Sequence, residues 1–448
     1  MHQNPNHPPL TAGANLRTVP SEIATVNASH YNSSPTSAIP LGRKTDPGFS
    51  PSARGASSLG LPHIRIVHWA PQFGSATGTG TAIAKWIECL TPTDVQVVVV
   101  APPRAGAIQA LPDSVRITGS RGLIGRLFEF WRTIRKTDLV HLHGGFDLKL
   151  SAIYLILTLE RILRWIEVRP LKILLTPHGA LSHQVFTRKS WKKNLYWHFL
   201  DRTLTKQIDL AICSTPREAR ELSELMPHIR TEVVPLVIET SGSEPPARKK
   251  GNPTTAPLLC TLGRYDINMK GLDLLIGAVK KLNAEGFPVK LRCIGYDRNH
   301  GTKVLDDYVK SVNAEHLVEC AGPKFGEEKE RAIQECDLFC MSSRYESFSY
   351  ALTEGMESGL PVLVGSGACV TSFFSEEQKQ QLVVAPEIDA WAAAIRRLMA
   401  DPEANRRCVS MALQDLRNRC APARVGESLK RIYIAEVRQS GLFGFTLD

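Results

Sequence analysis

Short apolar runs alternate with longer amphipathic stretches along most of this chain, beginning near residue 64. The short runs are rich in Val, Ile and Leu, which is typical of buried strands, and the stretches between them have the length of helices. In the first half we predict helices such as 81–90 and 123–133, between strands at 64–68, 95–101, 115–118, 138–143, 172–177 and 210–214. This alternation predicts βαβ units and a parallel sheet.

The pattern breaks near residues 239–257, where Gly, Ser, Pro and charged residues replace the apolar runs, and we predict a linker at 241–256. The pattern then restarts, with 272–282 as the clearest helix and with strands at 258–263, 289–295, 317–321, 337–342, 361–365 and 381–385. The fold class is therefore α/β, with two doubly wound, Rossmann-like domains at 61–240 and 257–420. We expect them to face each other across a cleft at their strand ends, where such sheets bind ligands.

The two ends of the chain have other patterns. Residues 1–60 are rich in Pro, Ser, Asn, Thr and Gly, with almost no apolar periodicity. They cannot bury enough surface to offset the entropy of ordering, so we predict a disordered tail. In the final segment, 421–448, the helical stretch 425–437 is expected to pack back as a strut.

Composition is that of a soluble globular protein: 448 residues, of which 43% are hydrophobic and 22% charged. The net charge of +10 permits nucleic acid, an anionic membrane or phosphorylated ligands as partners and does not choose among them. Because no nucleic-acid motif is present, we expect no nucleic-acid partner. The ten cysteines are scattered, mostly inside apolar strands, so we expect reduced thiols in a cytoplasmic protein and no metal site.

The apolar and basic segments of the chain bear on membrane attachment. The start of the chain has no apolar core of a signal peptide, and no apolar run reaches the ~18 residues of a spanning helix. The stretch 188–202 mixes basic and aromatic residues, and 151–166 is strongly apolar. Both segments could be ordinary helices with a solvated face, or could contact an anionic membrane surface. We expect a cytoplasmic location and keep peripheral contact with the inner leaflet of the plasma membrane as an open alternative.

Two glutamates, Glu346 and Glu354, stand out in the run 341–364, which reads as a strand, a polar turn, a helix and a second strand. A carboxylate just beyond a strand end and another on the first turns of the next helix can reach one ligand at that sheet edge. The helix N-terminus beside them favours anions, so the segment suits a sugar attached to a diphosphate. On spacing alone, two solvated charges on a helix face are the simpler interpretation, and the remaining motifs reverse that balance.

Arg264 and Lys270 flank the loop that follows the predicted strand 258–263 and leads into a helix near Leu272. A diphosphate in this loop would meet two cations and a helix N-terminus, each favouring negative charge. Taken alone, the pair could equally be surface residues.

Three histidines follow apolar strands in the first domain. His141 and His143 lie in His-Leu-His-Gly-Gly and point to the same side of their strand, and His178 lies in Thr-Pro-His-Gly. A ligand role and a packing role are about equally compatible with these positions.

The loop 74–83 is rich in glycine and follows the first strand. Its glycines, among them Gly78 and Gly80, would let backbone N–H groups approach a phosphate or acceptor. The loop lacks the lysine of a P-loop and the third glycine of a dinucleotide fingerprint, which argues against both of those classes.

Together these motifs resemble the retaining glycosyltransferases of family 4, the group 1 transferases with the GT-B fold. The resemblance spans roughly 64–437, and its strongest parts are Gly-Arg…Lys-Gly at 263–271 and Glu-x7-Glu at 346–354. His-Leu-His at 141–143 and Pro-His-Gly at 177–179 also look like family segments. Four motifs in register over two domains make the resemblance specific.

The resemblance implies a role for each donor-side residue. Arg264 and Lys270 would bind the donor diphosphate, Glu354 would hold the ribose hydroxyls, and Glu346 would face the donor sugar. The start of the following helix would contact sugar and phosphate through the backbone N–H groups of Ser347, Phe348 and Ser349. His143 would line the reaction centre, and His178 would contact donor or acceptor.

The implied function is transfer of a sugar from a nucleotide-diphosphate sugar to a glycan or lipid-linked acceptor, in surface polysaccharide or glycolipid synthesis. No Asp-x-Asp metal signature is present, so we expect a metal-independent enzyme without a cofactor. Two alternatives remain open, namely a nucleotide-sugar epimerase or hydrolase and a catalytically silent binding protein. Ser347 and Ser349 replace glycines common in the family, and the segment after Pro361 lacks the usual small-residue run, which leaves the choice of base and sugar open.

Overall fold

The computed structural model describes residues 64–73, 75, 77–90, 95–102, 115–118, 122–145, 148–166, 171–182, 205–239, 256–297 and 300–439. Three predictions concern other residues. The tail at 1–60, the basic aromatic stretch at 188–202 and the linker at 241–256, apart from its last residue, lie outside the described residues.

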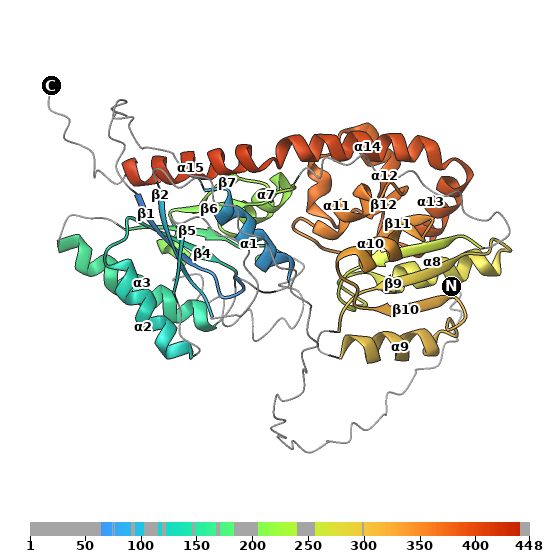
Figure 1. Cartoon of the computed structure of the whole chain (residues 1–448), viewed down its shortest axis with the longest axis horizontal. Coiled ribbons are helices and arrows are strands. Elements are labelled where there is room, and N and C mark those ends of the chain that lie inside the picture. Colours follow the sequence, from blue (N-terminus) through green and yellow to red (C-terminus); the bar gives the residue numbers. More distant parts are fainter. Residues whose placement is uncertain are drawn as a thin grey trace, which may run out of the picture. The chain divides into compact units, whose positions relative to one another are not determined.

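The first sheet has seven parallel strands in the order β3-β2-β1-β4-β5-β6-β7 (Figure 1). Its strands are β1 (Ile64–Trp69), β2 (Val95–Val100), β3 (Val115–Thr118), β4 (Leu139–His143), β5 (Lys172–Thr176), β6 (Leu210–Cys213) and β7 (Arg230–Val233). The helices along this part are α1 (Gly78–Glu88), α2 (Leu123–Ile134), α3 (Leu148–Ile166), the 3-10 turn η2 (Thr205–Gln207) and α7 (Pro216–Leu225). β1 lies between β2 and β4, so the strand order reverses there, at the kind of position where doubly wound sheets bind ligands.

The second sheet has six parallel strands in the order β10-β9-β8-β11-β12-β13. Its strands are β8 (Leu258–Leu262), β9 (Lys290–Ile294), β10 (Val318–Gly322), β11 (Leu338–Met341), β12 (Val362–Gly365) and β13 (Val383–Val384). Its helices are α8 (Leu272–Ala284), α9 (Gly301–Ser311), α10 (Gly326–Gln334), α11 (Tyr350–Glu357), η3 (Cys369–Phe373), α12 (Glu376–Leu382), α13 (Ile388–Ala400), α14 (Pro402–Arg419) and α15 (Pro422–Gln439). The order reverses between β8 and β11, and the loops after these two strands, together with α11, carry the predicted donor residues.

Two separate layers of apolar side chains cover the faces of the first sheet. Successive residues of β1 point to opposite faces, so Ile66 packs in one cluster with Trp86 of α1, and Val67 packs in another with Phe130 of α2 and Leu157 of α3. α15 also joins the first cluster, which makes α2 and α3 the cover of the opposite face. The two-sheet α/β architecture confirms the predicted fold class.

α15 is attached to the first sheet by polar contacts as well. The Glu436 carboxylate accepts a hydrogen bond from Arg230 at 2.7 Å, and the Lys172 ammonium lies 3.8 Å from it. The domain boundaries and the strut role predicted from the sequence stay predictions. None of the described helices combines the length and the apolar character that crossing a membrane requires.

The sequence pattern was wrong in three local details. α1 begins at Gly78 because the Thr77 side chain caps it, accepting a hydrogen bond from the Gly80 N–H at 3.1 Å, so the helix starts earlier than predicted. β7 was missed because this strand has no apolar run. The first two residues of the predicted strand 381–385 are the end of α12, and only Val383–Val384 pair as β13.

Candidate active site

The loop between β8 and α8 is shaped by two glycines. Gly263 has a φ of 155° and Gly271 a φ of 62°, values that favour glycine. A Cβ on Gly271 would lie 2.1 Å from the Ser342 carbonyl oxygen, so only glycine lets this loop touch the end of β11. The Ser342 hydroxyl closes the contact by donating to the Lys270 carbonyl at 2.8 Å. Local chain geometry therefore brings Lys270 to the end of the neighbouring strand.

Lys270 and Glu346 form an ion pair at this edge. The Lys270 Nζ donates to Glu346 Oε2 at 2.6 Å, and the two side chains are 17% and 26% exposed. Glu346 is fixed through its backbone, because its N–H donates to the Gly367 carbonyl at 3.2 Å and its carbonyl accepts from the Cys369 N–H at 2.7 Å. The loops after β8, β11 and β12 thus meet at one cation–carboxylate pair that joins two residues predicted from separate motifs.

Arg264 lines the same small pocket as Lys270, at the carboxyl end of β8. Gly263, Leu272 and Ser343 contribute further walls of this pocket. The Arg264 Nη2 is 3.8 Å from Asp266 Oδ2, and its buried Nε has no hydrogen-bond partner in the part of the chain that the structure describes. An unpaired buried N–H is costly, so Arg264 holds a donor that an anion could satisfy.

Glu354 has a cation of its own. It lies in α11, and its Oε1 is 2.9 Å from the Nζ of Lys329 in α10. Its side chain is 34% exposed, so the carboxylate also reaches solvent. Sequence reasoning missed Lys329, since no motif links α10 to the two glutamates.

The three residues at the start of α11 that were predicted to contact the donor have different surroundings. Ser349 is the N-cap, and its hydroxyl accepts from the Leu352 N–H at 3.3 Å. The Phe348 side chain is buried in the core. Ser347 lies against Gly179, where an added Cβ would come within 3.0 Å of the Ser347 Cβ. Any contact from Phe348 to a ligand is therefore left to its backbone.

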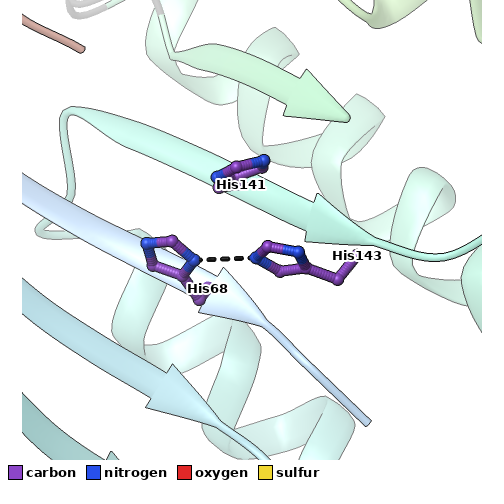
Figure 2. A group of neighbouring side chains, drawn as sticks. All are labelled: His68, His141 and His143. Carbon is purple, nitrogen blue, oxygen red and sulfur yellow. Dashed lines mark hydrogen bonds between the residues drawn. The ribbon is translucent and has the colours of Figure 1, made fainter. Parts of the chain in front are cut away.

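The histidines form a hydrogen-bonded chain at the ends of β1 and β4. Figure 2 shows His68 and His143 pointing their rings toward each other, with His141 beside them, and the Nδ1 of His68 lies 2.9 Å from the Nε2 of His143. The Nδ1 of His143 lies 3.0 Å from the Nε2 of His178. His141 bonds instead to the hydroxyls of Tyr433 and Thr176, at 2.9 and 2.8 Å.

The chain has a preferred proton arrangement. A neutral imidazole has one N–H, so each ring of the chain donates in one direction only. The Nε2 of His68 is buried without a partner, and we assign it as the unprotonated nitrogen because an unpaired buried N–H is the rarer case. His68 then donates to His143, His143 donates to His178, and His178 keeps its proton on Nδ1.

Burial keeps these rings neutral. Desolvation lowers the pKa of His68 to about 3 and that of His178 to about 4. The pKa values of His141 and His143 are held well below the usual range, first by burial and then by neighbouring histidines. At neutral pH the cluster can donate and accept hydrogen bonds but carries no positive charge.

The same cluster is the group with metal-ligand spacing among the described residues. One ring nitrogen each of His68, His141 and His143 lies within 4.8 Å of the others. Five of their six ring nitrogens already have hydrogen-bond partners, and the sixth is the Nε2 of His68. The nitrogens of His68 and His143 also point at each other rather than at a shared point (Figure 2). In the structure, these ring nitrogens therefore serve a hydrogen-bonded chain.

Gly78 and Gly80 lie in the first turn of α1, not in a free loop. A Cβ on Gly80 would come within 2.4 Å of the Ser75 carbonyl oxygen, so packing alone accounts for this glycine. A Cβ on Gly78 would meet nothing within 4 Å.

His68 and Tyr433 are site residues that sequence reasoning missed. His68 sits inside a predicted strand, and the available signal was its register with His141, which requires the pairing of β1 and β4 to be known. Tyr433 lies far along the chain in α15, and only tertiary packing brings its hydroxyl to His141.

Two protein-family models match the chain, described as Glycosyl transferases group 1 at 244–415 and Glycosyl transferase 4-like domain at 77–236. An uncharacterized 41.2 kDa protein in the cps region of Klebsiella pneumoniae is 27% identical, over 55% of this chain and 65% of its own length. A D-inositol 3-phosphate glycosyltransferase of Corynebacterium urealyticum is 23% identical, over 59% of this chain and 64% of its own length. The chain spans between 41% and 65% of the first curated relatives it matches.

Solved structures share the fold at low identity. Sucrose-phosphate synthase from Thermosynechococcus elongatus has a TM-score of 0.64 at 17% identity, over 84% of this chain and 98% of that one. Anabaena HepE in complex with UDP-glucose has a TM-score of 0.59 at 16% identity, over 84% and 100%. With both sheets arranged as in these GT-B proteins and with both family models matched, the chain belongs to the group 1, GT4-like glycosyltransferases of GT-B fold.

Proposed function

We propose that this protein transfers a sugar, with retention of anomeric configuration, from a nucleotide-diphosphate sugar to a glycan or lipid-linked acceptor. The observation that carries the proposal is the contact between Lys270 and Glu346 beside Arg264. Fixed positive groups next to a carboxylate suit a substrate with an anionic leaving group and a sugar that becomes electron-poor. A solved neighbour with UDP-glucose bound and relatives named as glycosyltransferases support a nucleotide-sugar donor.

The diphosphate side of the site is built from cations. As the bond between the sugar C1 and the phosphate oxygen breaks, negative charge grows on the departing diphosphate. Lys270 has three N–H donors and uses one on Glu346, so the others can bind phosphate oxygens. Arg264 supplies the unpaired Nε–H, and the N–H groups at the start of α11 add partial positive charge.

The sugar side is built from Glu346 and the histidine chain. Glu346 would lie near the positive charge that develops at C1, with Lys270 holding its carboxylate in place. Glu354 would exchange its partner Lys329 for the ribose hydroxyls, since a partly exposed ion pair holds it only weakly. His178, as assigned, offers its Nδ1–H to an oxygen of donor or acceptor, with His143 and His68 fixing that tautomer.

Retention follows if the acceptor oxygen attacks C1 on the face that the diphosphate leaves. The new C–O bond forms as the sugar–phosphate bond breaks, and the acceptor proton passes to an oxygen of the leaving phosphate. This route needs no covalent nucleophile and no metal or cofactor, and we propose it on those terms. A relative named as a lipopolysaccharide core biosynthesis glycosyltransferase, from Rhizobium meliloti, supports an acceptor in surface polysaccharide or glycolipid synthesis.

A panel of UDP-, GDP- and ADP-sugars tests the proposal. A bound donor raises the unfolding temperature by mass action, so one nucleotide should stabilise the protein at concentrations above its Kd. NMR of the product made with that donor should show the donor's anomeric configuration. An inverted product would refute retention, and hydrolysis or epimerisation without transfer would favour the alternative enzyme classes.

A further inference from the structure

The outward faces of α2 and α3 are apolar where solvated helices are polar. On α2, Ile124 is 84% exposed and Phe128 is 60% exposed. On α3, Leu155 is 60% exposed and Ile162 is 59% exposed, and Leu159 between them is exposed as well. These residues recur at intervals of three or four, so each helix carries one continuous apolar stripe facing away from the sheet.

The inward face of α3 is also the reverse of what an amphipathic helix usually buries. Its buried side holds an ion pair, since Arg164 donates to Glu160 at 3.0 Å and both side chains are less than a tenth exposed. Arg164 also donates to the Thr137 carbonyl at 2.8 Å, which ties α3 to the chain just after α2. Polar groups are thus sequestered while leucines and isoleucines face outward, which exposes apolar surface that a partner could bury.

The two stripes lie together. α2 and α3 cover the same face of the first sheet, are in contact and lie side by side (Figure 1). We call Ile124, Phe128, Leu155, Leu159 and Ile162 the α2–α3 face. Outward apolar stripes on two adjacent helices indicate an interaction surface rather than scattered exposed residues.

Positive charge borders this face. Phe128 is one helical turn from Arg132, which is exposed, and Arg135 lies over the ring of Trp131 at 5.6 Å. The segments 115–118 and 122–136 contain five basic residues and one acidic residue: Arg116, Arg126, Arg132, Arg135, Lys136 and Glu129. An apolar stripe with arginines at its end is typical of helices that lie in a membrane interface.

We propose that the α2–α3 face docks on an anionic lipid bilayer, with its apolar side chains among the acyl chains and its arginines at the phosphate headgroups. The positive charge beside the face favours an anionic bilayer over a neutral surface. It also disfavours a second copy of this chain, which would bring the same positive charge. The proposal stands on these two helices and does not depend on the sugar-transfer proposal. If both hold, the site would work on acceptors presented at a membrane.

Flotation of the full chain with vesicles tests the proposal. We expect binding to phosphatidylcholine vesicles that contain phosphatidylglycerol and weak binding to phosphatidylcholine alone. Replacing Ile124, Phe128, Leu155 and Leu159 by Gln should reduce binding at least ~10-fold without lowering the unfolding temperature, since these side chains are exposed. Replacing Arg132 and Arg135 by Gln should weaken binding to the anionic vesicles roughly 30-fold.

Matched controls come from exposed residues of the same kinds elsewhere. The pair Val304→Gln and Met411→Gln, and the single change Arg407→Gln, should bind vesicles as the wild type does. Three results would overturn the proposal: no flotation of the wild type, equal flotation of wild type and both α2–α3 variants, or a self-association that the apolar variant abolishes without vesicle binding. The last result would instead make the face an interface between copies of this chain.

Discussion

Replacing Lys270 with Ala removes the cation at the centre of the proposed site. Its Nζ is 2.6 Å from Glu346, and the side chain is 17% exposed, so solvent screens its charge only in part. Two consequences follow. Glu346 loses its cation, and a diphosphate bound beside the pocket loses one of its two cations, Arg264 being the other.

The size of each consequence can be worked out. A full charge about 4 Å from the ammonium is attracted by roughly 4 kcal/mol at an effective dielectric constant of about 20. Only the charge that develops as the bond breaks lowers the barrier, and removing one preorganised group of this kind costs about 2.7–4 kcal/mol. We therefore expect kcat/KM to fall about 10²- to 10³-fold. The loss of the ion pair should lower the free energy of unfolding by at most about 1 kcal/mol, since both side chains are partly exposed.

The assay is donor turnover, followed as release of the nucleoside diphosphate, with urea unfolding alongside. Lys281→Ala is a matched control, because Lys281 also forms a 2.6 Å ion pair, with Asp389, away from the pocket. The control should change turnover by less than about 2-fold, because substitutions of surface residues usually have only small effects. Equal turnover in Lys270→Ala and wild type, or an equal loss in the control, would refute the assignment of the site.

Three further predictions concern the other carboxylate and the histidine chain. Glu354→Gln should raise the donor KM about 10-fold with little change in kcat, since a hydrogen bond to a charged group contributes about 1.5 kcal/mol; an unchanged KM would remove Glu354 from the ribose site. His68→Phe should lower kcat about 5- to 10-fold by freeing the tautomer of His143, and His68→Gln, which keeps an N–H donor, should retain more activity; equal losses would indicate a packing role only. The lowered pKa of His68 also predicts how this one ring contributes to stability as the pH changes. Its contribution is full above pH 6.5 and is lost as the pH falls toward 3, because the unfolded chain takes up the proton first. Between pH 6 and pH 4.5, the free energy of unfolding measured in urea should change less steeply with pH in His68→Phe than in the wild type, by roughly 1.2 kcal/mol per pH unit, and equal slopes would contradict the burial of a neutral ring.

The sequence was sufficient for the architecture because the relevant signals are local. β11 is a continuous apolar run and β2 is apolar at all but one position, and the length of the stretches between strands separates helices from strands. The sequence also predicted that Lys270 and Glu346 lie at one site, because both motifs sit directly after strands of one sheet and the carboxyl ends of parallel strands share an edge. Their ion pair was not predicted and is seen only in the structure.

The features that sequence missed depend on packing between distant elements. Lys329 reaches Glu354 from another helix, and Tyr433 reaches His141 from the end of the chain. The outward leucines of α3 look like core residues in the sequence, since an apolar stretch does not reveal which of its faces is covered. Ser349 could not be distinguished from a ligand contact until its capping bond to Leu352 was known.

The most direct test of the account is the affinity of the protein for a nucleoside diphosphate compared with the matching monophosphate, measured by titration calorimetry with the base found in the donor panel. If Arg264 and Lys270 bind the second phosphate, the wild type should prefer the diphosphate by at least ~10-fold, as one charge-assisted hydrogen bond suffices for that ratio. In the double variant Arg264→Ala and Lys270→Ala, the preference should disappear while the monophosphate still binds. A preference that survives both changes would contradict the proposed site.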